Sequence, residues 1–387
     1  LTQDHLLQLD GEPMRIALVT ESVDNETGIG RIVYALSRQF VQRGHDIYLV
    51  AHNISVANHA SHVYRITRPT PWHSVNRFML RYSVPRALRI LDCDVVNSYL
   101  VGRGATVITA QSCHAAGVSL RVQDPEIRPR GNAGLFDRIA VQDEKALFRS
   151  SDTRRIIAVS RLVKHQICEY YKVDEEKIVV IPNGVDLERF AGLRNAEKPQ
   201  ALRYKMGLHE DERVLLFVGN EFARKGLHVV IKAMSRLRGY PMRLVVLGGD
   251  DPAPFVRLAS RFGLASKIEF RGSVSGPEEY FCIADAFVFP TYYEPFGLVI
   301  IEAMAAGVPV ITSKYAGAVE GMHHGVDGLF LDNPASEEEL AATLQQLLDN
   351  PGLSDTLTRN AMNRVRAFSW DLIAEKTLDV YRAAIAK

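Results

Sequence analysis

Two carboxylates flank a glycine turn within residues 289–312 of this 387-residue chain, and no other segment indicates chemistry so strongly. Glu294 comes just before the turn, and Glu302 comes about two helical turns after Gly297. A helix that begins near Gly297 would present unpaired N–H groups and the positive end of its dipole, which attract a diphosphate. Glu294 would face the group beyond the phosphates, and Glu302 would accept hydrogen bonds from paired hydroxyls such as those of a ribose. One segment would therefore bind three parts of a nucleotide sugar.

A first glycine loop, Thr27-Gly28-Ile29-Gly30, lies between an expected strand and an expected helix. Gly28 and Gly30 would let the backbone approach a phosphate or a sugar closely. A dinucleotide fingerprint needs a third glycine at position 33, where this chain has Val33, and this disfavours an NAD enzyme. The alternative interpretation is an ordinary turn from strand to helix.

A basic pair, Arg224 and Lys225, occupies the corresponding place in the second half of the chain. Two cations at the start of a helix oppose the helix dipole, so the helix alone does not explain them. A bound anion would explain them, and a solvated basic turn is the alternative.

The segment from Glu294 to Glu302, followed by Gly307-Val308-Pro309-Val310, resembles a signature of the retaining glycosyltransferases of family 4. That signature is a Glu, seven residues and a second Glu, ahead of a Gly-x-Pro-Val turn and strand. The resemblance covers nearly the whole chain from Met14. Within the family, the chain is similar to sugar transferases of the lipopolysaccharide-core and phosphatidylinositol mannoside type. It implies the α/β GT-B fold, in which two Rossmann-like doubly wound domains face a central cleft.

The resemblance also implies site residues. Lys225 and Arg224 would neutralise the diphosphate, although Asn220 stands where many relatives carry an arginine. Glu294 and His114 would lie near the transferring sugar and, with Lys225, form the expected catalytic set. The expected donor-binding set is Gly28, Gly30, Arg224, Lys225, Arg271, Val274, Glu294, Phe296, Gly297, Leu298, Val299 and Glu302.

The implied reaction is the retaining, metal-independent transfer of a sugar from a nucleotide diphosphate sugar, expected to be a UDP-sugar, to a hydroxyl acceptor. The acceptor would be a glycan, a lipid or a small molecule. Two rival classes stay open. The first is another GT-B enzyme: an epimerase would convert its donor without an acceptor, and a sugar phosphorylase would need free phosphate. The second is a non-catalytic nucleotide-binding module, which would bind the donor without turnover.

No cofactor or metal is expected. Asp92-Cys93-Asp94 fits the Asp-x-Asp metal pattern, but it precedes a strand of the first half, away from the donor-binding half. Cys113 lies beside His114, yet no further residue is placed to complete a cysteine triad, so Cys113 is interpreted as a packing residue. A histidine taken without its context is more often structural than catalytic.

The composition fits a folded chain in a reducing compartment. Hydrophobic residues make up 47% of the sequence, and the longest apolar runs fall far short of the roughly 18 residues that cross a bilayer. The four cysteines include no Cys-x-x-Cys pair, which disfavours a zinc site or a disulfide framework. We therefore predict a cytoplasmic protein. A net charge of +1 gives no general attraction to nucleic acid.

Apolar runs alternate with segments of helical period, which is typical of parallel sheets covered by helices on both faces. The expected strands include Arg15–Val19, Ile47–Ala51, Ile156–Val159 and Ile178–Ile181 in the first series, and Val214–Val218, Leu244–Leu247, Ile268–Phe270 and Phe287–Phe289 in the second.

Four parts are expected along the chain. Residues 1–13 would be an extension, 14–190 an acceptor-side domain and 200–365 a nucleotide-sugar-binding domain. The resemblance implies that a terminal helix in 366–387 returns to the first domain.

Residues 65–89 interleave arginines with aromatic side chains such as Trp72 and Tyr82. Such a mixture would seat the protein peripherally on an anionic membrane, at its inner face, or bind an acidic acceptor. The alternative is a surface helix with its aromatic side chains buried inward. No recognised nucleic-acid-binding module surrounds this stretch, and no nucleic-acid partner is expected.

Overall fold

The computed structural model describes residues 12–24, 27–56, 59–60, 62–66, 83–99, 103–123, 134–191 and 197–386. These residues form two compact units. Unit 1 comprises the described parts of Leu1–Leu120, Asn132–Ile181 and Trp370–Lys387. Unit 2 comprises those of Pro182–Ser369 and Arg121–Gly131.

The main sheet of unit 1 is parallel, and within the described residues it has seven strands in the order β5-β3-β1-β6-β7-β8-β9. The strands are β1 (Arg15–Val19), β3 (Asp46–Ala51), β5 (His62–Arg65), β6 (Val95–Ser98), β7 (Val107–Ala110), β8 (Arg155–Ala158) and β9 (Ile178–Val180). A second small sheet pairs β2 (Ser22–Val23) with β4 (Asn53–Ile54). The central strands are buried, as expected of a parallel sheet covered on both faces.

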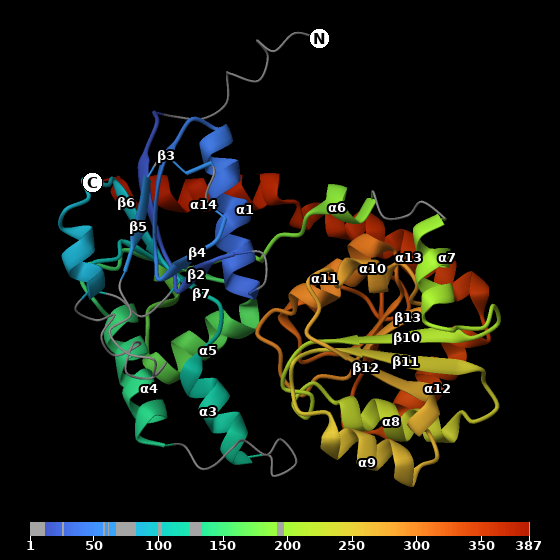
Figure 1. The fold of residues 1–387 in the computed structure, drawn as a ribbon. Helices are drawn as coiled ribbons and strands as arrows, with labels where there is room; N and C mark the ends of the chain where they lie inside the picture. The colour runs from blue at the N-terminus through green and yellow to red at the C-terminus, as the bar shows by residue number, and fades with distance from the viewer. Residues whose placement is uncertain are drawn as a thin grey trace. The chain divides into compact units, whose positions relative to one another are not determined.

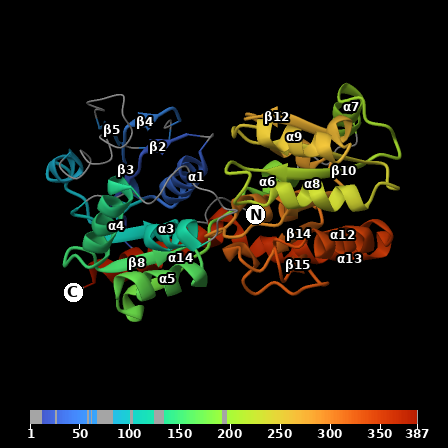
Figure 2. The ribbon, with the colours of Figure 1, turned by 90° about the horizontal axis from the view of Figure 1, so that it is seen from below.

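The helices of unit 1 include one from the distant end of the chain. They are α1 (Gly28–Gln42), α3 (His114–Gln123), α4 (Leu135–Phe148), α5 (Arg161–Tyr171), the short η2 (Glu175–Lys177) and α14 (Trp370–Ile385). Helix α14 packs against α1 (Figure 1), and both α14 and α5 lie next to β8 (Figure 2). The Asn97 Nδ2 group on β6 donates a 2.6 Å hydrogen bond to the Tyr381 hydroxyl, and both side chains are buried. Helix α14 is therefore part of the core of unit 1.

Unit 2 has a parallel sheet whose described strands follow the order β12-β11-β10-β13-β14-β15. They are β10 (Arg213–Val218), β11 (Met242–Leu247), β12 (Ile268–Gly272), β13 (Ala286–Phe289), β14 (Val310–Ser313) and β15 (Leu329–Leu331). Its helices are α6 (Leu187–Ala191), α7 (Glu197–Lys205), α8 (Leu227–Arg236), α9 (Ala253–Arg261), η3 (Ala265–Lys267), α10 (Glu278–Phe281), α11 (Leu298–Ala306), η4 (Gly317–Val319), α12 (Glu337–Leu348), α13 (Pro351–Arg364) and η5 (Val365–Phe368). Figure 1 shows α8 and α9 on one face of the sheet and α10 and α11 on the other.

Residues 182–190 belong to unit 2, whereas the sequence analysis placed them at the end of the first domain. The Val185 N–H donates a 2.8 Å hydrogen bond to the Phe368 carbonyl, and the Phe190 ring meets the Phe281 ring edge-on with centroids 6.0 Å apart. These contacts attach residues 182–190 to unit 2.

The predicted fold class is confirmed, since both units are parallel α/β sheets with crossover connections. In unit 2 the strand order reverses between β10 and β13, because β11 and β12 lie on one side of this pair while β14 and β15 lie on the other. In unit 1 the reversal lies between β1 and β6. Ligands of such sheets bind outside the carboxyl ends of the strands at this reversal, which points to the loops after β10 and β13.

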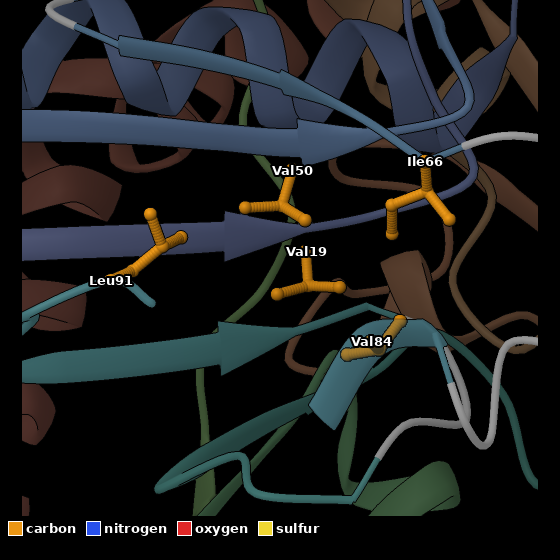
Figure 3. Close-up of a cluster of buried hydrophobic side chains, with 5 residues drawn as sticks. All are labelled: Val19, Val50, Ile66, Val84 and Leu91. Atoms are coloured by element: carbon orange, nitrogen blue, oxygen red, sulfur yellow. The ribbon is translucent and has the colours of Figure 1, made fainter. Parts of the chain in front are cut away.

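The carboxyl-terminal end of the basic stretch packs into unit 1. Figure 3 shows a buried cluster beside β1 and β3 that consists of Val19, Val50, Ile66, Val84 and Leu91. Arg86 and Arg89 are exposed, so residues 83–89 bury apolar side chains and present arginines to solvent. Residues 67–82 of the stretch, including Trp72 and Tyr82, and residues 1–11 of the expected extension lie outside the described residues.

Among the helices formed by the described residues, none combines the length and the apolar character that a membrane span requires. All four cysteines are free thiols.

Candidate active site

The loops after β10 and β13 are hydrogen-bonded to each other. The Tyr292 N–H, after β13, donates a 3.0 Å hydrogen bond to the Arg224 carbonyl, after β10. Gly226 ends the first loop with φ +80°, and a Cβ at this position would lie 2.3 Å from the Pro290 carbonyl oxygen. Only a glycine allows this close approach. The two loops at the reversal of strand order therefore form one continuous structure.

Lys225 is the central cation of this structure. Its Nζ lies 3.7 Å from Glu294 Oε2, and its side chain is only 13% exposed. The same Nζ lies 5.2 Å from the centroid of the Phe289 ring, within the range of a cation–π interaction. Burial, opposed by Glu294 and reinforced by Arg224, lowers the pKa of Lys225 below its ordinary value.

Arg224 contacts the same carboxylate from a second direction. Its guanidinium lies 3.4 Å from Glu294 Oε2, and it forms a 2.7 Å ion pair with Glu221. It also donates a hydrogen bond to the Tyr293 carbonyl. Burial lowers the pKa of Arg224, but the carboxylates of Glu294 and Glu221 more than offset this effect and raise it. The carboxylate of Glu294 is thus held between two cations.

The backbone around Glu294 is fixed by the segment that follows β14. The Glu294 N–H donates to the Tyr315 carbonyl, and the Gly317 N–H donates to the Glu294 carbonyl, each at 2.9 Å. The Ala318 N–H donates a 2.7 Å hydrogen bond to the Phe296 carbonyl. These bonds fix the direction in which the chain enters α11.

Helix α11 begins without a side-chain cap, because its N-cap residue is Gly297. Gly297 has φ +100°, and a Cβ there would lie 2.9 Å from Ile300 Cδ1. The first turn, which contains the expected donor-binding residues Leu298 and Val299, carries no acidic side chain. The amino end of this helix therefore offers N–H groups and a positive dipole end to an anion.

Glu302 is a buried carboxylate in an otherwise apolar helix. It is 7% exposed, and the other buried residues of α11 are Ile300, Ile301, Ala303, Met304 and Ala305. Burying an ionised carboxylate is unfavourable unless it is paired or hydrogen-bonded.

Arg271 and Val274 lie at the carboxyl end of β12, along the same sheet edge. The guanidinium of Arg271 forms a 2.6 Å ion pair with Glu269, which gives it a structural role in β12. The Gly248 N–H donates a 2.8 Å hydrogen bond to the Gly272 carbonyl, so the end of β12 is tied to the loop after β11. Val274 is partly buried beyond this point.

Asn220 has a structural partner that explains its place in the loop. Its Oδ1 accepts a 2.7 Å hydrogen bond from the Gly249 N–H, and the Phe222 N–H donates at 2.8 Å to Asp250. Asn220 thereby ties the loop after β10 to the loop after β11. The sequence did not predict this contact, nor the ion pair of Arg224 with Glu221.

In unit 1, Gly30 is required by an internal helix cap. Thr27 Oγ1 accepts a 3.1 Å hydrogen bond from the Gly30 N–H, and Asp24 accepts one of 2.6 Å from the Thr27 N–H. A Cβ at Gly30 would lie 2.5 Å from Thr27 Oγ1. Gly28, at the first position of α1, is exposed.

His114 is the first residue of α3 and follows β7 closely. Its N–H donates a 2.8 Å hydrogen bond to Glu144, and its Nε2 lies 3.3 Å from Asp137 Oδ1. Cys113 is buried, and burial raises the pKa of its thiol to about 12. The neutral thiol agrees with the interpretation of Cys113 as a packing residue.

The structure thus brings Lys225, Arg224 and Glu294 into contact in unit 2. Gly28, Gly30 and His114 belong to unit 1. The sequence analysis missed Asp137 and Glu144, because nothing in their local sequence indicates a contact with His114.

The Asp-x-Asp pattern has a structural explanation at the amino ends of β1 and β6 in unit 1. Asp94 accepts a 2.7 Å hydrogen bond from the Arg15 N–H, and both Asp92 and Asp94 pair with the Arg15 guanidinium. Across the part of the chain that the structure describes, no group of three or more His, Cys, Asp or Glu side chains is arranged to hold a metal ion.

Comparison with protein families assigns both halves of the chain. Residues 27–189 match the model of the family described as Glycosyltransferase Family 4. Residues 200–364 match the model described as Glycosyl transferases group 1.

The chain is similar to a glycosyltransferase of Methanocaldococcus jannaschii, MJ1607, whose function is uncharacterised. The two are 33% identical over 236 residues, which cover 60% of each. It is also similar to the D-inositol 3-phosphate glycosyltransferase of Streptomyces avermitilis, with 32% identity over 245 residues. That match covers 60% of this chain and 52% of the Streptomyces enzyme, so the chain spans little more than half the length of these relatives.

Solved structures share the fold at lower identity. WaaG, a glycosyltransferase involved in lipopolysaccharide biosynthesis, superposes with a TM-score of 0.79 at 22% identity, covering 95% of this chain and 99% of WaaG. Anabaena HepE in complex with UDP and glucose gives 0.74 at 18% identity, covering 96% and 100%. With one family model on each half and this shared fold, the chain belongs to the GT-B glycosyltransferases that combine a family 4 domain with a group 1 domain.

Proposed function

We propose that this chain is a retaining, metal-independent glycosyltransferase that transfers a sugar from a UDP-sugar to a hydroxyl acceptor. The observation that carries this proposal is the arrangement after β10 and β13, where Lys225 and Arg224 lie beside the uncapped amino end of α11. UDP as the nucleotide is supported by the neighbour HepE, which was solved with UDP and glucose.

Lys225 and Arg224 are proposed to neutralise the departing diphosphate. A cation that is buried and pre-positioned stabilises developing charge more strongly than one in water. Both cations are paired with Glu294, so a diphosphate would compete with this carboxylate for them. The backbone from Phe296 to Val299 would add N–H groups to the phosphates and the sugar. These groups supply the charge that a metal ion supplies in other sugar transferases.

Glu294 is proposed to orient the sugar rather than to attack it. Its carboxylate lies 3.4 and 3.7 Å from two cations, and an ion-paired carboxylate is a weaker nucleophile than a free one. Attack by the acceptor from the face that the phosphate leaves would retain the anomeric configuration. The proposed retention of configuration rests on the resemblance to family 4. The same resemblance assigns His114 and Gly28 of unit 1 to donor binding.

Glu302 is proposed to accept hydrogen bonds from the ribose hydroxyls, and the main chain from Arg271 to Val274 to contact the base. Glu302 is buried in the same helix whose amino end is proposed to bind the diphosphate. Arg271 itself is already paired with Glu269, so its main chain is the better candidate for a base contact.

The acceptor is proposed to be a lipid-linked or lipopolysaccharide-type glycan. The exposed Arg86 and Arg89 support this class, because arginines at a surface attract anionic lipids or acidic glycans. The involvement of WaaG in lipopolysaccharide biosynthesis points the same way. A small polar acceptor is the second candidate, and the similarity to a D-inositol 3-phosphate glycosyltransferase favours it.

The proposal is tested in three steps with the full chain. A thermal-shift screen of nucleoside diphosphates should show the largest stabilisation with UDP. Donor hydrolysis with a panel of UDP-sugars then identifies the sugar, and transfer to glycolipid and inositol phosphate acceptors separates the two candidates. The anomeric proton coupling of the product, measured by NMR, should show retention, and activity should survive EDTA.

Other results would favour the rival functions. Conversion of the donor sugar without an acceptor would indicate an epimerase, and a requirement for inorganic phosphate would indicate a phosphorylase. UDP binding without turnover on any acceptor would indicate a binding module. Peripheral membrane contact through residues 65–89 would be contradicted if the protein fails to bind anionic vesicles at low salt.

A further inference from the structure

Helix α4 contacts His114 through two carboxylates. Asp137 and Glu144 lie seven residues apart, so they project from the same face of the helix. Asp137 Oδ1 lies 3.3 Å from His114 Nε2, and Glu144 Oε2 accepts a 2.8 Å hydrogen bond from the His114 N–H. One helix therefore contacts both the ring and the backbone of this residue.

Tyr171 on α5 is hydrogen-bonded to the same part of the structure as His114. Its hydroxyl donates a hydrogen bond to Glu144 and accepts one of 3.1 Å from the Ala115 N–H, and the side chain is buried. Burial and the nearby Glu144 raise the pKa of Tyr171, so its phenol is neutral. The thiol of Cys113 is neutral as well. Two carboxylates of α4, those of Asp137 and Glu144, contact His114.

A carboxylate at one ring nitrogen decides where an imidazole carries its proton. An ionised carboxylate only accepts hydrogen bonds, so the nitrogen that faces it must be an N–H. The other nitrogen of the neutral ring is then an acceptor. For His114, the nitrogen facing Asp137 is Nε2, which leaves Nδ1 as the acceptor.

We infer that Asp137 is a positioning residue that fixes His114 in the Nε2–H tautomer, so that Nδ1 accepts a hydrogen bond from a hydroxyl of the transferring sugar. The sugar contact rests on the proposed function, whereas the tautomer follows from the contact with Asp137 alone. His114 Nε2 lies 3.3 Å from Asp137 Oδ1 but is not aligned with it for a hydrogen bond. Hydrogen bonds at active-site residues are often long or poorly aligned before a substrate binds, and they tighten when it does.

Asp137 also has a structural role that a test must separate from this one. Its Oδ2 accepts a 3.2 Å hydrogen bond from the Gly134 N–H at the start of α4. Asp137→Asn is the informative variant, because the amide oxygen can keep the Gly134 bond while the NH2 group faces the ring. A donor at that place forces Nε2 to become the acceptor and moves the proton to Nδ1. The same logic applies wherever a buried carboxylate sets a histidine tautomer.

The experiment uses the full chain labelled with 15N-histidine at pH 8.5, where neutral rings dominate. Two-bond 1H–15N correlation spectra distinguish the Nε2–H ring, the Nδ1–H ring and the protonated ring. The His114 signals are assigned by their loss in His114→Gln. We expect Nε2–H in the wild type and Nδ1–H in Asp137→Asn. The kcat/KM of that variant should fall about 10- to 100-fold, mainly in kcat, with an unchanged melting temperature.

A matched control lies on α5 of the same unit. His165 and Glu169 form an exposed pair at 3.7 Å, so Glu169→Gln removes a carboxylate from a histidine that has no proposed role. This variant should leave both the His114 signals and kcat unchanged.

The possible results separate the inference from the proposed function. An Nδ1–H or a protonated His114 in the wild type would overturn the inference without any activity measurement, even if the variant fails to fold. An unchanged tautomer in Asp137→Asn would overturn it as well. A changed tautomer with an unchanged kcat/KM would overturn the sugar contact. If the tautomer changes but the wild type transfers no sugar, the proposed function fails while the role of Asp137 stands.

Discussion

The Nζ of Lys225 occupies the space where a side chain at position 219 would begin. A Cβ at Gly219 would lie 2.3 Å from this atom, and Gly219 has φ +137°, which L side chains rarely adopt. Gly219→Ala should therefore displace the Lys225 ammonium. Loss of a charge-assisted bond worth about 1.5 to 3 kcal/mol should weaken UDP binding roughly 10- to 150-fold, measured by isothermal titration calorimetry.

The control for this change is Gly239→Ala. Nothing lies within 4 Å of a Cβ at Gly239, so this variant should bind UDP like the wild type. Binding within twofold of the wild type in Gly219→Ala would mean that Lys225 is not a phosphate ligand.

As the pH rises, the affinity for UDP should begin to fall at a lower pH than it would if Lys225 had the ordinary pKa of a lysine. Only the protonated Lys225 attracts phosphates, and burial lowers its pKa, so charge is lost below the ordinary value of 10.5. Calorimetric titrations between about pH 8 and 10, where the phosphates are fully ionised, should show this loss. Lys225→Arg keeps its charge throughout this range and should flatten the profile. A wild-type affinity that falls no more steeply than that of Lys225→Arg over this range would contradict the prediction.

The assignment of Glu302 to the ribose can be tested from both the protein and the ligand. Glu302→Ala should weaken UDP binding roughly 10- to 150-fold, if the lost hydrogen bonds are worth about 1.5 to 3 kcal/mol. The wild type should discriminate against 2′-deoxy-UDP, and the variant should not. A variant that still prefers UDP to its deoxy analogue would show that the hydroxyl is recognised elsewhere. Glu279→Ala, at an exposed glutamate of α10, serves as the control.

The buried hydrogen bond between Asn97 and Tyr381 should stabilise unit 1. Tyr381→Phe leaves the Asn97 amide without its 2.6 Å partner, and an unsatisfied buried donor costs about 1 to 3 kcal/mol. Urea unfolding followed by circular dichroism should show this loss. Tyr204→Phe removes the same hydroxyl from a side chain that is 89% exposed, and it should change stability by less than about 0.5 kcal/mol. Equal stability of the two variants would refute the argument.

The sequence predicted buried strands well and exposed ones poorly. Strand β1 spans the predicted Arg15–Val19, and β10 begins one residue before the predicted Val214, because doubly covered parallel strands are continuous apolar runs. Strand β5 was not predicted, since all four of its residues are exposed at the sheet edge and show no apolar pattern. Its aromatic contacts, such as Tyr48 stacked on His62, become visible only in the structure.

In the candidate site, too, some contacts could be predicted from the local sequence and others could not. The contact of Lys225 with Glu294 could be anticipated, because a glycine loop after one strand and a carboxylate after its neighbour converge where the strand order reverses. The roles of these residues stay predictions. The contact of Glu144 with His114 spans 30 residues and depends on how α4 packs, and no local pattern encodes that packing.

The chain leaves unit 1 after Ile181 and re-enters it at Trp370. During synthesis, therefore, the 182–369 segment can fold as soon as it leaves the ribosome, while the earlier unit must wait for a helix made almost two hundred residues later. Until α14 is made, the Asn97 side chain lacks its Tyr381 partner, and the surfaces of α1, β6 and β8 that α14 covers lack that cover. A nascent chain that stalls before this point would carry a finished second unit and an unfinished first one.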